Sequence, residues 1–134
     1  MLSKGLRDEE NQKMNRLLNE ALEMEFVPDL WKNQQREALN RKLQETLNLT
    51  LEDIENSNPE ELLKKLQDEE FSFANYEQFG DLMMKLLPRE AAENQPKLAK
   101  TAVAVYEFAQ RESQTFSFSL IQKINEAKAE SEDL

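Results

Sequence analysis

Carboxylates are the only side chains in this sequence whose types could support catalysis or metal binding. The chain has no histidine and no cysteine, so the usual ligands of zinc, copper and haem and the usual bases of nucleophilic catalysis are missing. The densest acidic clusters are Glu20/Glu23/Glu25, Glu60/Glu61 and Asp68/Glu69/Glu70. None has the spacing of a calcium loop, and a di-metal helical bundle would need Glu-x-x-His motifs.

We therefore predict no catalytic residue, no metal site and no cofactor, and a chain that is not an enzyme. The acidic clusters are better explained as solvated helix faces and as partners of helix dipoles. A small enzyme that uses carboxylates in a helical cleft to bind a metal or a ligand is kept as the alternative function.

The formal charge of −10 is unevenly distributed along the chain. Residues 1–47 carry 8 basic and 9 acidic side chains, whereas residues 48–134 carry 9 and 18. An acidic body repels phosphate backbones and anionic lipid headgroups, which argues against nucleic acid and membranes as partners. The nearly neutral N-terminal segment is the better candidate for a buried or self-associating surface.

Neither a signal sequence nor a membrane span is evident in the sequence. The N-terminal residues lack an apolar stretch, and no uninterrupted apolar run along the chain reaches the length that crosses a bilayer. We expect a cytoplasmic protein.

The elements that carry these residues should all be helices. Only two glycines and four prolines interrupt a sequence rich in Leu, Glu, Lys, Gln and Ala, and period-2 alternation is scarce. We predict an all-α fold of about six helices in a single domain, residues 1–134. The longer helices are expected at residues 8–25, 30–47, 75–87, 98–111 and 117–130, with residues 88–95 as a connection.

Capping signals define two further short helices between the long ones. Thr50 can cap a helix with Asp53 three residues later, and Asn58 followed by Pro59 is a second start signal. The expected architecture is an N-terminal helical hairpin over residues 1–47, these two short helices, and a second hairpin with a terminal capping helix within residues 48–134.

The second hairpin resembles a known repeat. Tyr76, Phe79-Gly80 and Met83, followed by Ala102-x3-Tyr106-x2-Ala109, are similar to the two helices of one tetratricopeptide (TPR) unit. In such hairpins the small residues let the helix backbones approach closely. The connection is about ten residues longer than in the family, and Gln114 stands where the family has a proline.

A broader likeness covers residues 48–128, which resemble small uncharacterised bacterial proteins with a TPR-like C-terminal half. The residues that carry it include Asn58-Pro59-Glu60-Glu61 and Thr115-Phe116-Ser117-Phe118. This resemblance implies a fold and brings no activity.

Five apolar residues form the candidate interaction surface: Leu18, Trp31, Leu43, Phe73 and Phe108. The first three belong to the N-terminal hairpin, whose apolar stripes could be covered by a second copy or, equally, by the rest of the same chain. Phe73 and Phe108 belong to an aromatic group that could receive a partner, although core packing explains such a group better. Because Phe108 lies off the stripe of Ala102, Tyr106 and Ala109, we expect it to face the last helix.

The leading functional hypothesis is a protein-binding or scaffold module that acts through helical surfaces. The expected partner is a protein, with homodimerisation through the N-terminal hairpin as the proposed mode of assembly. The sequence identifies neither the partner nor a pathway.

Overall fold

The computed structural model describes residues 2–69, 71–114 and 117–131, and within these it is helical without strands, which confirms the all-α prediction. Seven helices of six residues or more occur in the described ranges. They are α1 (Leu2–Glu23), α3 (Arg36–Leu47), α4 (Leu51–Asn56), α5 (Pro59–Asp68), α6 (Phe73–Leu86), α7 (Gln95–Ser113) and α8 (Phe118–Ser131).

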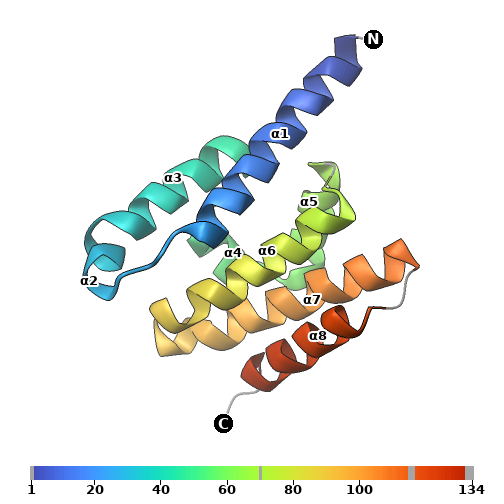
Figure 1. Ribbon diagram of the computed structural model, residues 1–134. Helices are drawn as coiled ribbons and strands as arrows, with labels where there is room; N and C mark the ends of the chain where they lie inside the picture. Colours follow the sequence, from blue (N-terminus) through green and yellow to red (C-terminus); the bar gives the residue numbers. More distant parts are fainter. Residues whose placement is uncertain (1, 70, 115–116, 132–134) are drawn as a thin grey trace.

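The five longest helices lie side by side in the order α3, α1, α6, α7 and α8, while α4 and α5 pack on α7 behind this row (Figure 1). The N-terminal turns of α1 extend beyond the neighbouring helices, and the start of α1 and the end of α8 lie at opposite ends of the molecule (Figure 1). Residues of every helix from α1 to α8 except the three-residue α2 (Pro28–Leu30) contribute to one buried apolar core.

The N-terminal hairpin differs from the prediction at its turn. The helix α1 ends at Glu23 and begins already at Leu2, whereas we expected residues 8–25. Pro28 does not end the first helix but begins α2, where a proline at the first helical position loses no hydrogen bond. A π-helical turn, η1 (Trp31–Gln35), then joins α2 to α3.

The predicted caps of α4 and α5 are confirmed. Thr50 and Asp53 form a reciprocal capping box, and Asn58 Oδ1 accepts hydrogen bonds from the backbone N–H groups of Glu60 and Glu61. A third cap was not predicted. Ser72 and Asn75 form a capping box that starts α6 at Phe73, two residues before the expected start.

The connection between α6 and α7 contains two 3-10 turns, η2 (Leu87–Arg89) and η3 (Ala92–Asn94), where a plain connection was expected. The helices α6 and α7 then pack closely at Gly80. A Cβ atom at this position would lie 2.5 Å from Cε1 of Tyr106, so the Tyr106 ring occupies the space that the missing side chain leaves. The hydroxyl of Tyr106 donates a hydrogen bond to Asp81 at 2.6 Å, which fixes the ring there.

Candidate functional site

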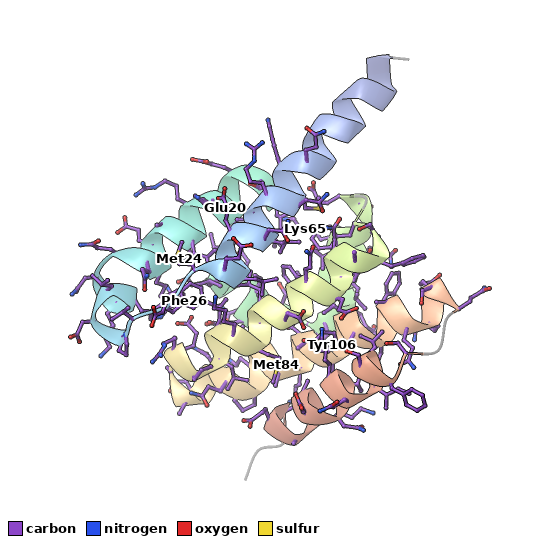
Figure 2. All side chains as sticks on the ribbon, viewed as in Figure 1. Glu20, Met24, Phe26, Lys65, Met84 and Tyr106 are labelled. Carbon is purple, nitrogen blue, oxygen red and sulfur yellow. The ribbon has the colours of Figure 1, made fainter. Side chains whose placement is uncertain are left out.

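Two adjoining hollows follow the line along which α1 and α3 meet. The first has a volume of about 120 Å³ and is mainly apolar. Leu17, Ala21, Phe26 and Leu39 are buried beneath it, and the exposed side chains of Met24 and Ala38 stand at its rim. Figure 2 shows Glu20, Met24 and Phe26 succeeding one another from the last turn of α1 toward the connection with α2.

The second hollow, of about 300 Å³, continues from the first toward the N-terminal end of α1. It shares Leu17, Glu20 and Lys42 with the apolar hollow, so that the two form one continuous depression, which we call the α1–α3 groove. Its remaining lining is polar and comes from both helices: Lys13, Arg16, Glu45 and Thr46.

The groove presents more basic than acidic side chains, although the chain as a whole is acidic. Lys13, Arg16 and Lys42 line it together with Glu20 and Glu45, while the whole chain carries −10. Among the side chains that the structure describes, which begin at Gln12, neither Lys13 nor Arg16 has an ion-pair partner. Lys42 pairs with Glu20 across the groove at 3.2 Å, and both side chains are about half exposed. An exposed pair of this kind contributes about 0–1 kcal/mol, so it opens easily.

Contacts with α6 fix the position of α1, and therefore of the groove. Lys85 of α6 reaches the C-terminal end of α1, where its ammonium group donates hydrogen bonds to the carbonyl groups of Ala21, Leu22 and Met24. These carbonyls have no partner within the helix, and a cation near them also complements the helix dipole. The same ammonium group lies 4.6 Å from the centre of the Phe26 ring. Its burial lowers the pKa of Lys85.

Side-chain amides join the same two helices further along. The amide of Asn75 donates to Asn15 at 2.5 Å, and that of Gln78 donates to Asn19 at 2.8 Å. Because Asn15 and Asn19 are four residues apart on α1, these two bonds set the register between the helices. The groove is thus built on a hairpin that is held against the rest of the chain.

A cluster of charged side chains lies where α3 meets α4 and the connection between α6 and α7. Arg36 donates to the buried carboxylate of Glu90 through Nε at 3.1 Å and Nη2 at 3.0 Å, and to Glu52 through Nη1 at 2.7 Å. Asn40 also donates to Glu52 and accepts the backbone N–H of Leu51 at 2.7 Å. Hydrogen bonding to Glu90 raises the pKa of Arg36, and hydrogen bonding to Arg36 lowers the pKa of Glu52.

Two buried carboxyl groups in this cluster have opposite pKa shifts. Burial raises the pKa of Glu55 to about 8, and the hydrogen bond with Glu90 and the charge of Glu90 act in the same direction. Burial also disfavours the charged form of Glu90, but its hydrogen bonds with Arg36 and Glu55 outweigh burial and lower its pKa. A raised and a lowered carboxyl side by side is the pattern of a pair that shares one proton.

The described part of the chain contains no group of three or more acidic side chains arranged to hold a metal ion. In the cluster around Glu52, Glu55 and Glu90, the positive charge that binds the carboxylates comes from the guanidinium group of Arg36. The predicted acidic clusters at Glu20, Glu60 and Asp68 are separate from it.

Three of the five residues predicted to form an interaction surface are inside the core. Leu18 and Leu43 are 0% exposed and Trp31 is 2% exposed, so none of them is available to a partner in the folded chain. Their placement on a surface is wrong because the apolar stripes of the hairpin are covered by the rest of the same chain. The spacing of apolar residues along each helix indicated a face that must be covered. It could not indicate whether the same chain or a second protein covers that face.

The other two predicted residues have different surroundings. Phe73 is 51% exposed at the start of α6. Phe108 is partly buried, and its ring lies 4.7 Å from that of Tyr76, so it packs on α6 and not on the last helix as expected. Neither residue borders the α1–α3 groove. The residues that line the groove were not predicted from the sequence. A usable signal was present, because Lys13 and Arg16 are basic, lie three positions apart on a helix and belong to a nearly neutral segment.

Comparison with known proteins gives no match to a family model, to a curated protein or to a solved structure. The resemblance of residues 76–109 to a TPR unit therefore stays a prediction. No helix in the described ranges combines the length and the apolar character that crossing a membrane requires.

Proposed function

We propose that this chain is a protein-binding module and that the α1–α3 groove receives an amphipathic, acidic helix of a partner protein. The observation that carries the proposal is the apolar hollow adjoining Lys13 and Arg16, two basic side chains without ion-pair partners among the side chains described from Gln12 onward. A helix laid in a groove binds through apolar anchors along one face, and a charged residue at one end fixes its direction.

The dimensions of the groove fit such an occupant. Its α1 wall runs from Lys13 to Met24, which corresponds to about 17 Å or three helical turns at 1.5 Å per residue. The apolar hollow of about 120 Å³ is comparable to the cavity of roughly 150 Å³ that holds benzene in an engineered protein. It therefore has room for one aliphatic side chain such as leucine.

Charge favours an acidic partner over a basic one. An acidic side chain placed near Lys13 and Arg16 could form ion pairs with both of them. Lys42 would also be available to it, because opening the exposed pair between Lys42 and Glu20 costs little free energy. A basic helix would meet Lys13 and Arg16 as like charges, although the acidic body of the chain would attract it elsewhere.

The preformed shape of the groove also supports binding. Its buried residues Leu17, Ala21 and Leu39 are part of the core, and the bonds from Lys85, Asn75 and Gln78 hold α1 in place. A site that is already ordered loses little conformational entropy on binding, so less of the contact energy is spent on ordering.

The test is a titration of the full chain with two labelled helical peptides of about four turns each. Both carry leucines at i, i+4 and i+7; one has glutamates and the other lysines at the end that would face Arg16. The acidic peptide should bind more tightly than the basic one. Ala38→Glu, which places a charge at the apolar hollow, should weaken binding by about tenfold or more, equivalent to about 1.4 kcal/mol.

Arg16→Glu should remove the preference for the acidic peptide, and Ala129→Glu on the exposed face of α8 is the matched control. Equal binding of both peptides, or an effect of Ala129→Glu as large as that of Ala38→Glu, would contradict the proposal. A mass in solution that doubles and returns to that of one chain in Ala38→Glu would show that a second copy occupies the groove instead.

A further inference from the structure

Three carboxylates surround one guanidinium group at the junction between the N-terminal hairpin and the rest of the chain. Arg36 at the start of α3 binds Glu90, between η2 and η3, and Glu52 on α4. Glu55 lies one turn after Glu52 on the same helix and is only 7% exposed. One cation cannot neutralise three acids, and a buried carboxylate without compensation is costly.

The hydrogen bonds of Glu55 point to how this imbalance is resolved. Its Oε1 atom is buried and has no hydrogen-bond partner among the described residues as long as Glu55 is ionised, because the neighbouring Glu90 carboxylate can only accept. A proton on Glu55 turns this carboxyl group into a donor, and the neighbouring Glu90 carboxylate can accept from it. Glu90 then receives hydrogen bonds from Arg36 and Glu55 together, so that the two carboxyl groups attract each other where two ionised ones would repel.

We propose that Glu55 carries a proton when the hairpin is docked, and that loss of this proton loosens the contact of α3 with α4 and with the connection between α6 and α7. The group is a proton-sensitive latch between residues far apart in the sequence, since Arg36 and Glu90 are 54 positions apart. It concerns how the hairpin is held, and it stands whether or not the groove has a partner.

The direction of the pH dependence follows from the shift of Glu55. In an undocked or unfolded chain this carboxyl titrates near its ordinary pKa of 4.5, whereas burial beside Glu90 raises its pKa to about 8. Between these values the docked chain holds one proton more, so docking weakens as pH rises. The ratio of docked to undocked chains falls by up to about tenfold per pH unit and levels off above the raised pKa. The lowered pKa of Glu90 acts in the opposite sense and only at more acidic pH.

Charged groups on the other elements around Glu55 modulate this effect without removing it. Arg36 from α3 favours the ionised form, whereas Glu90 and Glu52 disfavour it. On the α7 side, Lys97 and Lys100 border a hollow of about 180 Å³ that Glu55 also lines. Both lysines are exposed, so water screens their attraction for an ionised Glu55.

The experiment follows the full chain from about pH 5 to pH 9, a range that spans the docked-state titration. Chain labelled with ¹³C at the glutamate side-chain carboxyl reports each titration by NMR. Trp31 is the sole tryptophan, is 2% exposed and lies next to α3, so its fluorescence reports docking of the hairpin. Hydrogen-exchange protection factors of the α3 amides, in which the intrinsic exchange rate at each pH is divided out, provide a second, independent report.

We expect one glutamate to titrate above about pH 6.5. Trp31 emission should shift to longer wavelength, and the protection factors of the α3 amides should fall, at the same midpoint. Glu55→Gln keeps a neutral donor toward Glu90 and should abolish all three changes. Glu130→Gln makes the same change of charge at an exposed position on α8 and should leave them intact.

Two results would overturn the latch. One is a wild-type chain in which every glutamate titrates below about pH 6, which needs no variant and so decides the matter even if Glu55→Gln does not fold. The other is a high titration of Glu55 that leaves both Trp31 emission and the protection factors of the α3 amides unchanged.

Discussion

Replacing Gly80 by alanine tests the packing between α6 and α7, because two opposing effects meet at this residue. In the interior of a helix, alanine is more favourable than glycine by about 1 kcal/mol. Here, however, the new Cβ would lie 2.5, 2.8 and 2.9 Å from three ring atoms of Tyr106. Contacts this short force the ring or the helix backbone to move.

The ring has little freedom to move away. Tyr106 is 1% exposed, and its hydroxyl is held by the hydrogen bond to Asp81, which in turn accepts from Lys123 at 3.1 Å. Overpacking of a core costs about 1–3 kcal/mol, and weakening a hydrogen bond to a charged group costs about 1.5–3 kcal/mol. The clash should therefore exceed the helix-propensity gain, and we expect Gly80→Ala to lower the free energy of unfolding by about 2 kcal/mol.

Urea unfolding followed by far-ultraviolet circular dichroism measures this change, and Tyr106→Leu supplies the control. Leucine lacks the two ring atoms that lie nearest to Gly80, so in that background Gly80→Ala should be neutral or stabilising by up to about 1 kcal/mol. The reasoning is refuted if Gly80→Ala stabilises the wild-type chain, or if its cost is the same in both backgrounds.

Two further substitutions test other local features. Gln114 ends α7 with a φ of 57°, a left-handed conformation that costs a non-glycine residue about 1 kcal/mol or more. Gln114→Gly should therefore raise the free energy of unfolding, measured in urea, by roughly 0.5–1 kcal/mol. A lower free energy of unfolding in this variant would contradict the prediction. Lys85→Met keeps the apolar stem but removes the donor that the carbonyl groups of Ala21, Leu22 and Met24 share at the end of α1. It should destabilise the chain by about 1–2 kcal/mol and accelerate hydrogen exchange at the end of α1, whereas Lys128→Met at an exposed position of α8 should not.

The local signals in the sequence predicted the elements well because each acts within a few residues. Thr50 with Asp53 and Asn58 with Pro59 start α4 and α5 as expected. The Ser72 cap was overlooked because the apolar residues around it are typical of a strand. Pro28 was assigned to the wrong side of a boundary, since a proline can either follow a helix or begin one.

The placement of the elements relative to each other could be predicted only in part. The stripe of Leu18 and Leu43 showed that the hairpin has an apolar face, but periodicity carries no information on what covers that face. The bonds from Lys85 to α1 and from Arg36 to Glu90 join residues more than fifty positions apart. No spacing rule connects such residues, so neither the anchored hairpin nor the buried carboxyl pair could be read from the sequence.

The proposal that the α1–α3 groove binds a partner helix is tested most directly by NMR. Amide chemical shifts of the ¹⁵N-labelled full chain are mapped during titration with the acidic helical peptide. We expect the perturbed amides to lie along residues 13–24 and 38–46, and Ala38→Glu to reduce their response. Perturbations confined to the surface around Phe73 and α8, or no saturable perturbation at all, would contradict it.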